Sequence, residues 1–137
     1  MITLQSTSVE IKQPIGEVFE YIQNIDNLKI VFNRISKDWQ NTSNTLKFRL
    51  GVPFLSKFSF EFKVDQVEPY KIYLKSYGES YANCSIIIKL VPDREQTLGQ
   101  FLFETPEETF QDTNCPTKPL IIHMLQIFCN NLASEFN

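Results

Sequence analysis

Residues 9–22 read VEIKQPIGEVFEYI and change from a strand pattern to a helix pattern. Val9 and Ile11 alternate with polar residues, which is typical of a strand with one buried face. Pro14 then interrupts the strand and suits the first turn of a helix, where a missing N–H costs nothing. The apolar residues that follow recur at helical spacing: Ile15, Val18, Phe19 and Ile22. The stretch therefore predicts a strand, a sharp break and a helix.

The flanking sequence extends this pattern in both directions. Upstream, Ile2 and Leu4 continue the strand, and a shift of register near residues 6–8 predicts a bulge. Downstream, residues 25–32 predict a second short helix with Asp26 as its capping residue. The side chains expected to face inward from this helix are those of Leu28, Val31 and Phe32.

Apolar and polar residues alternate through most of the chain from Trp39 to Phe103. Connectors at residues 51–53, 68–69, 77–79 and 92–94 divide this region. The pattern predicts about six consecutive antiparallel strands with one apolar face and one solvated face. The apolar positions are Leu46, Phe48, Leu50, Phe58, Phe60, Phe62, Val64, Ile72, Leu74, Cys84, Ile86, Ile88, Leu90, Phe101 and Phe103.

The last part of the chain predicts a polar connection followed by one long amphipathic helix. Its apolar positions are Leu120, Met124, Ile127, Phe128 and Leu132. A single long helix that follows a curved sheet is expected to cross the apolar face of that sheet. The predicted class is α+β, with a curved antiparallel sheet of about six to seven strands around the C-terminal helix.

Size and charge restrict the function. The 137 residues predict a single domain spanning residues 1–137, since two domains would each be too small for a good core. The net charge of −3 and the lack of a basic run disfavour general nucleic-acid binding, so no nucleic-acid partner is expected. No secretory signal is recognised, and the longest apolar runs are far too short for a membrane helix. A cytoplasmic protein without stable membrane insertion is expected.

The positions of the cysteines, glycines and acidic residues exclude several kinds of binding site. Cys84, Cys115 and Cys129 are widely spaced, which favours reduced thiols over a disulfide framework or a zinc site. The four glycines are too far apart for a phosphate-binding loop. An acidic group around Pro106 matches no cation-binding loop, so we expect a solvated connection there. Neither a metal nor a cofactor is expected.

The order and lengths of the expected elements resemble the helix-grip fold of the START-like and Bet v 1-like superfamily. Its small bacterial members are often grouped with polyketide cyclases and dehydratases. The resemblance is carried by residues 9–22, by the short helix that follows, by Trp39 at the start of the second strand and by residues 118–120 before the last helix. It covers nearly the whole chain, but the superfamily offers no catalytic signature to compare.

The resemblance implies a hollow core between the sheet and the long helix. In relatives this cavity holds lipids, sterols, polyketides, quinones or other apolar molecules, and entry is expected through residues 51–57 or the two short helices. The residues expected to line a binding site are Phe48, Phe60, Phe62, Ser76, Cys84, Ile86, Phe101, Phe103, His123, Met124 and Ile127.

Each of these residues also has a purely structural interpretation. The aromatic stripe can simply fill the space beneath the helix, and this is favoured for any single phenylalanine. Cys84 is small enough either to leave room for a ligand or to accommodate a large neighbour. His123 can point into the groove as a ligand contact or general base, or lie half-exposed at the helix edge. The second placement is favoured, because no carboxylate partner is recognisable.

Three functions remain open at this point. The first is binding of an apolar or amphipathic small molecule. The second is a cyclase or dehydratase activity, which is disfavoured because only Gln66, Ser76, Cys84 and His123 are inward-facing polar candidates. The third is a protein-interaction module with no identified partner, as in relatives that assist chaperones or ribosomes. It would need an exposed apolar patch.

Overall fold

The computed structural model describes residues 1–33, 36–42, 45–50, 59–76, 83–111 and 117–137. Side-chain placement is described for these ranges except residues 33, 36–42, 47–50 and 59–60. The connectors expected at residues 51–53 and 77–79 lie outside them.

Eight strands in the described part of the chain form one antiparallel sheet with the order β1-β8-β7-β6-β5-β4-β3, and β2 also pairs with β8. Six of these strands follow the two short helices as a consecutive meander, as the alternating pattern predicted. The strands are β1 (Ile2–Gln5), β2 (Val9–Ile11), β3 (Ser36–Thr42), β4 (Thr45–Leu50), β5 (Ser59–Glu68), β6 (Lys71–Ser76), β7 (Ser85–Asp93) and β8 (Gln96–Thr105).

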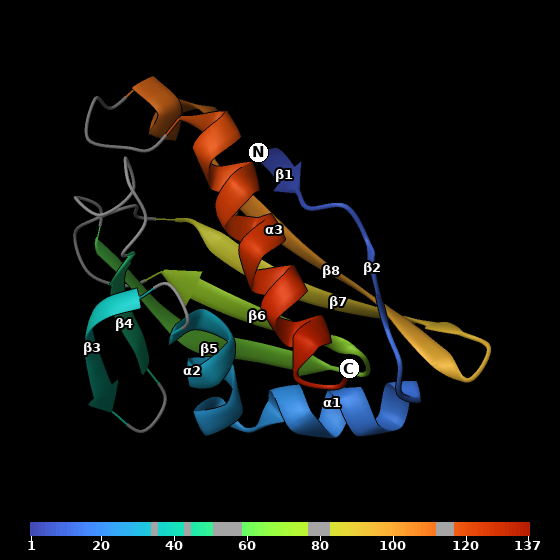
Figure 1. The fold of residues 1–137 in the computed structure, drawn as a ribbon. Coiled ribbons are helices and arrows are strands. Elements are labelled where there is room, and N and C mark those ends of the chain that lie inside the picture. The colour runs from blue at the N-terminus through green and yellow to red at the C-terminus, as the bar shows by residue number, and fades with distance from the viewer. Residues whose placement is uncertain (34–35, 43–44, 51–58, 77–82, 112–116) are drawn as a thin grey trace.

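Helices cover one side of the sheet. The long helix α3 (Lys118–Ser134) runs diagonally across the strands, and α1 (Ile15–Gln23) and α2 (Ile25–Asn33) lie near its C-terminal end (Figure 1). A short 3-10 helix, η1 (Glu107–Gln111), follows β8. The expected α+β architecture, with a curved sheet gripping the C-terminal helix, is confirmed.

The first strand is interrupted where the sequence predicted a shift. Gln5 pairs with Leu102 and Val9 with Gly99, so one extra residue is accommodated between β1 and β2. Ser6 fills the interruption, since its N–H donates to the backbone oxygen of Phe101 at 2.9 Å and its Oγ accepts the Phe101 N–H at 3.0 Å. The Ser6 hydroxyl takes the place of a backbone carbonyl acceptor, which the change of register between β1 and β2 removes from the strand pairing.

The two short helices start as the sequence requires, with one correction. Pro14 precedes α1, and its carbonyl accepts the first helical hydrogen bonds. Asn24, and not Asp26, caps α2: its Oδ1 accepts the Asp26 N–H at 3.0 Å, and its carbonyl accepts from Asn27 and Leu28. The expectation for Asp26 was wrong because the helix begins at Ile25, as predicted, and Asp26 therefore lies inside the first turn.

The core lies between α3 and the concave face of the sheet. Its centre is an aromatic group in which the Phe128 ring lies 4.4 Å from that of Phe32 and 6.3 Å from that of Phe101, between ring centroids. All three rings are fully buried, and each contributes about 1.5–3 kcal/mol through removal from water. The α3 side chains that are buried against this core are Ile121, Met124, Leu125, Phe128, Cys129, Leu132 and Ala133.

Candidate functional site

A row of residues crosses the inner face of the sheet from β4 to β8. Phe62 on β5 pairs with Leu46 on one side and with Ser76 on the other. Ser76 is joined in turn to Cys84, since its N–H donates to the Cys84 carbonyl at 2.8 Å and its Oγ accepts the Cys84 N–H at 3.1 Å. The strand register therefore brings together residues from four segments of the chain.

The row continues as a line of small polar groups. The Sγ of Cys84 lies 3.0 Å from Oγ1 of Thr105, and this Oγ1 lies 2.6 Å from that of Thr109. Burial raises the pKa of the Cys84 thiol, while hydrogen bonds from Thr105 and Thr109 act in the opposite direction. The thiol is therefore neutral near pH 7 and a poor nucleophile. The line, which we call the neutral polar line (Ser76, Cys84, Thr105 and Thr109), offers hydrogen bonds without charge.

The adjacent row of the inner face is apolar. Ile86 on β7 pairs with Leu74 on β6 and with Phe103 on β8, and Phe103 pairs with Leu4. Met124 of α3 belongs to the same buried cluster. An apolar wall beside a few polar groups is the composition of small-molecule sites in general.

Seven of the eleven expected site residues lie in this interior: Phe62, Ser76, Cys84, Ile86, Phe101, Phe103 and Met124. Phe48 and Phe60 pair with one another across β4 and β5, but their side chains lie outside the described set. Ile127 is half-buried on α3. Phe101 contacts the Phe32 and Phe128 rings, so it belongs to the packed centre of the core.

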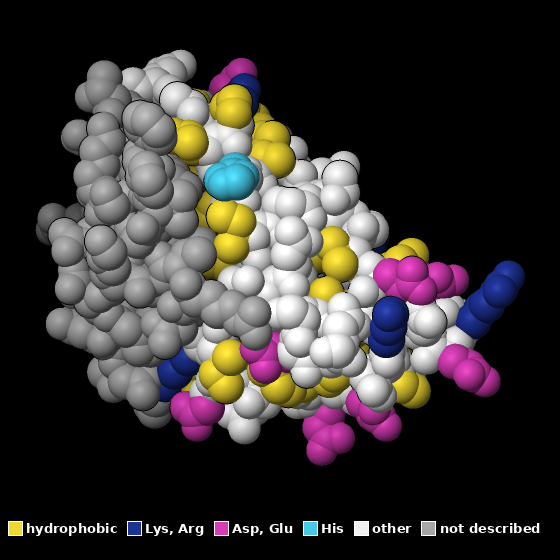
Figure 2. All heavy atoms as spheres, in the orientation of Figure 1, with side chains coloured by type: hydrophobic (Ala, Val, Ile, Leu, Met, Phe, Trp, Pro, Cys, Tyr) yellow, Lys and Arg dark blue, Asp and Glu magenta, His cyan; other side chains and the backbone are white. Residues whose placement is uncertain are grey.

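His123 does not point into the groove. Its side chain is exposed on α3, and Figure 2 shows it on the outer surface of the molecule with hydrophobic side chains beside it. The helix docks through Met124, Leu125 and Phe128, and His123 precedes Leu125 by about 200° of helical rotation. The alternative placement at the helix surface is therefore the one observed.

Gln66 was expected to face inward and instead lies on the surface. The pairing of β5 with β6 shifts between Val64 and Gln66, so an irregularity at Asp65 reverses the direction of the residues that follow. The Nε2 of Gln66 donates to Oε1 of Glu68 at 2.8 Å. This removes one of the four polar candidates for the interior, and the exposure of His123 removes another.

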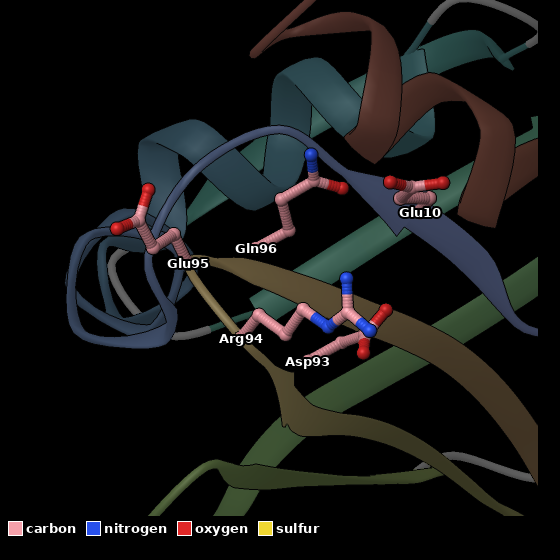
Figure 3. Close-up of a pocket in the computed structure, with 5 residues that line it drawn as sticks. All are labelled: Glu10, Asp93, Arg94, Glu95 and Gln96. Atoms are coloured by element: carbon pink, nitrogen blue, oxygen red, sulfur yellow. The ribbon is translucent and has the colours of Figure 1, made fainter.

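Two surface depressions were not anticipated from the sequence. One, of about 580 Å³, lies at the β7–β8 turn and is lined by Glu10, Asp93, Arg94, Glu95 and Gln96 (Figure 3). The other, of about 340 Å³, lies between α1 and the β5–β6 turn, where Phe19 and Tyr70 meet edge to face. The first is walled by charged groups, which does not suit an apolar ligand.

The part of the chain that the structure describes shows neither a metal site nor a membrane span. No group of three or more histidine, cysteine, aspartate or glutamate side chains among these residues is placed to hold an ion. None of the helices in the described ranges is long and apolar enough to cross a bilayer. Glu107 and Glu108 are exposed on η1, as expected for a solvated connection.

Comparison with known proteins supports the architecture. No family model matches the chain, and no curated protein matches it. Among solved structures, the Aha1 dimer from Colwellia psychrerythraea is 18% identical, with a TM-score of 0.68 over 99% of this chain and 96% of that one. The fold is a helix grip.

Two further solved structures agree. The KanY protein is 9% identical, with a TM-score of 0.72 over 98% of this chain and 97% of that one. XoxI from Bacillus cereus is 14% identical, with a TM-score of 0.68 over 99% and 96%. At these identities the likeness shows a shared fold over the whole length and nothing about activity.

Proposed function

We propose that the protein is a START-like binding protein that holds an apolar or amphipathic small molecule between the sheet and α3. The observation that carries the proposal is the inner face itself, where the neutral polar line borders the apolar row of Leu74, Ile86 and Phe103. Such a surface suits a molecule that is mostly apolar and carries a hydroxyl or carbonyl group.

The proposed lining divides into two parts. Ile86, Phe103 and Met124 contact the apolar body of the ligand, whereas Ser76 and Cys84 face its polar group. Phe62 extends the lining along β5, and Phe101 closes it toward the aromatic centre. Phe48 and Phe60 stay in the proposed set on the strength of the sequence alone. Ile127 contacts the ligand from the edge of α3. His123 is left out of this set, because its side chain is exposed.

Binding is favoured over a cyclase or dehydratase reaction. General acid–base catalysis needs a titratable group near the operating pH within hydrogen-bond reach of the substrate. His123, the acid–base candidate from the sequence, lies outside the interior, and the pKa of the Cys84 thiol is raised by burial. The neutral polar line can orient a ligand but is poorly suited to move a proton.

A protein-interaction function is also disfavoured by the described surface. Apart from Val67 and Tyr70, which lie together at the small depression beside α1, the large apolar side chains exposed there are scattered over different elements. Examples are Ile30 on α2, Val91 on β7 and Ile122 on α3. Single exposed apolar residues are normal for a monomer and do not make a docking surface.

Cys84 and Cys129 are thiols, which agrees with the proposed cytoplasmic location.

Native mass spectrometry of gently purified protein tests the proposal together with a fluorescence titration. We expect a discrete additional mass in native spectra that disappears on denaturation. Phenylnaphthylamine, an apolar dye that fluoresces when removed from water, is expected to bind saturably at a single site. A bare protein mass combined with no saturable dye binding would contradict the proposed function.

A further inference from the structure

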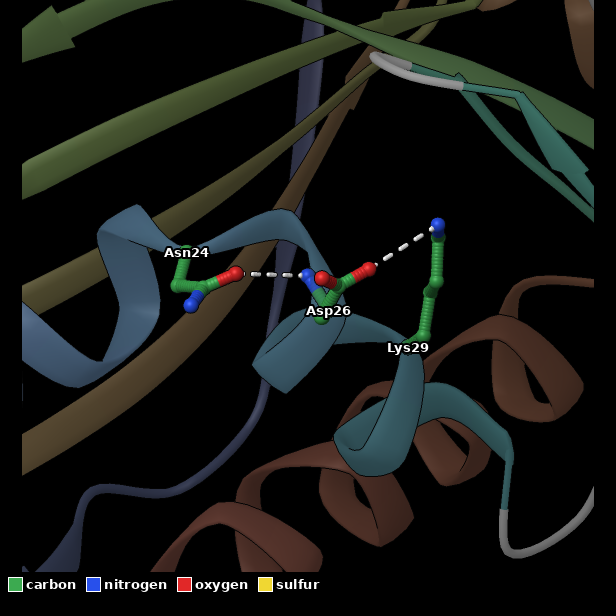
Figure 4. Close-up of polar contacts among 3 residues, drawn as sticks. All are labelled: Asn24, Asp26 and Lys29. Carbon is green, nitrogen blue, oxygen red and sulfur yellow. Dashed lines mark hydrogen bonds and ion pairs between the residues drawn. The ribbon is translucent and has the colours of Figure 1, made fainter.

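Lys29 on α2 is the one charged side chain among the buried residues of the described part of the chain. Its side chain is 11% exposed, and its Nζ lies 3.3 Å from Oδ1 of Asp26. The Asp26 side chain is 75% exposed. Figure 4 shows this ion pair at the first turn of α2, next to the Asn24–Asp26 hydrogen bond.

The ion pair does not account for the burial of the Lys29 side chain. An ammonium has three N–H donors, and the hydrogen bond to Asp26 engages one of them. A carboxylate as exposed as that of Asp26 stays hydrated, and pairs of this kind add little to stability. The other two N–H donors of the ammonium can therefore serve a second acceptor.

The position of Lys29 connects it to the interior. It follows Leu28 in α2 and precedes Val31 and Phe32, and all three of these side chains belong to the main core cluster. The Phe32 ring contacts Phe128 of α3, so this face of α2 forms one wall of the interior. Lys29 and Phe32 are three residues apart in α2, so they are neighbours on the surface of the helix.

We propose that Lys29 anchors the oxyanion of an amphipathic ligand, a carboxylate or an equivalent monoanionic group, whose apolar part occupies the interior. This inference rests on the proposed function and narrows its ligand class to apolar acids. The ammonium donates to the ligand oxyanion while Asp26 holds the lysine side chain in place. The neutral polar line then contacts an uncharged polar group elsewhere on the same ligand.

Two dyes that differ only in one sulfonate group test the inference. Anilinonaphthalene sulfonate carries a sulfonate on the same ring system as phenylnaphthylamine, so the ratio of their dissociation constants isolates the effect of the anionic group. We expect Lys29→Gln to weaken sulfonate binding by about tenfold or more, the loss of one charge-assisted hydrogen bond, and to leave the neutral dye unchanged. Lys75→Gln is the matched control, because Lys75 is exposed on β6 and the charge change is the same.

Two further variants distinguish anchoring from a structural role. Lys29→Arg keeps the charge and is expected to retain most of the preference for the sulfonate. Asp26→Asn removes a competing anion and is expected to tighten sulfonate binding, an effect that loss of structure would not produce. Dodecanoate should also displace the neutral dye at lower concentration than dodecanol does. Near-UV circular dichroism verifies that each variant is folded.

The outcomes separate the two proposals. If Lys29→Gln leaves both dyes unchanged, or weakens both equally, the anchoring role is wrong while the binding function stands. If neither dye binds saturably to the unmodified protein, the binding function fails and the anchoring role fails with it. Selective loss of sulfonate binding in Lys29→Gln, with a tighter Asp26→Asn variant, supports both.

Discussion

The ring of Phe32 on α2 meets the ring of Phe128 on α3 edge to face, with centroids 4.4 Å apart and an interplanar angle of 70°. This contact joins two helices that are distant in sequence, and Phe101 on β8 completes the group from the sheet. Because α2 and α3 enclose the proposed binding interior, this aromatic contact fixes the shape of its packed end.

Phe128→Ala should lower the free energy of unfolding by about 3–5 kcal/mol, because it removes a fully buried ring and leaves a cavity beside two others. Urea denaturation measures the loss. Phe136→Ala is the matched control, since Phe136 is only half-buried and its ring lies 5.0 Å from that of Tyr21. Equal losses in the two variants would mean that the aromatic group is not the centre of the core.

Asn24→Ala should lower the free energy of unfolding by about 1 kcal/mol, the usual cost of losing a helix cap. Asn24→Asp keeps an acceptor oxygen at the same place and adds a charge that the helix N-terminus favours, so it should preserve stability. Thermal unfolding of the three proteins checks this. A loss in Asn24→Asp as large as that in Asn24→Ala would show that the Oδ1 hydrogen bond is unimportant.

The sequence predicts most of the fold because the signals are local. Alternation along the strands, Pro14 before α1 and the apolar spacing of α3 each report on neighbouring residues, and the strands and helices that they predict are present in the structure. Even the interruption near Ser6 follows from the change of alternation between Leu4 and Val9. The interior position of Ser76 and Cys84 follows in the same way from strand register.

The remaining features depend on contacts between distant segments. Gln66 turns outward because of an irregularity at Asp65 in the pairing with β6, which alternation within β5 does not report. His123 and Ile127 lie beside the buried stripe of α3, and the sheet decides which helical face is covered. The burial of Lys29 on α2 has no signal in the sequence, because a charged residue in a short amphipathic helix normally lies at the surface.

Thr105→Val should lower the free energy of unfolding by about 1–2 kcal/mol, because the methyl group cannot bond to Cys84 or Thr109 and leaves both without their shared neighbour. Thr105→Ser keeps the hydroxyl and loses only a methyl group. It should therefore retain the hydrogen bonds at a smaller cost. Denaturant titration of both variants distinguishes the two effects, and a stability of Thr105→Val at or above that of Thr105→Ser would contradict the role of the neutral polar line.

Stability should decrease at alkaline pH through Cys129. Burial raises the pKa of this thiol to about 11, while hydrogen bonds from Ser6, Val9 and Phe101 oppose the shift. The unfolded chain loses the same proton near its ordinary pKa of 9.0, so the folded state binds more protons between these values. The protonated Cys129 thiol therefore contributes about 2–3 kcal/mol to the free energy of unfolding. This contribution is present in full below pH 9 and is lost as the pH rises toward 11.

Comparison with Cys129→Ala isolates this contribution, since tyrosines and lysines titrate in the same range. The difference in unfolding free energy between the two proteins should shrink as the pH increases from 8 to about 11, measured by urea denaturation. A difference that stays constant across this range would show that the Cys129 thiol titrates normally in the folded protein.

Methyl NMR of the protein titrated with phenylnaphthylamine tests the central claim most directly, because it locates the bound molecule. If the ligand lies between the sheet and α3, the methyl signals of Ile86 and Met124 shift on saturation, whereas those of Ile30 and Ile122, which are exposed on α2 and α3, stay in place. Shifts confined to exposed methyl groups, with Ile86 and Met124 unchanged at saturation, would contradict binding in the interior.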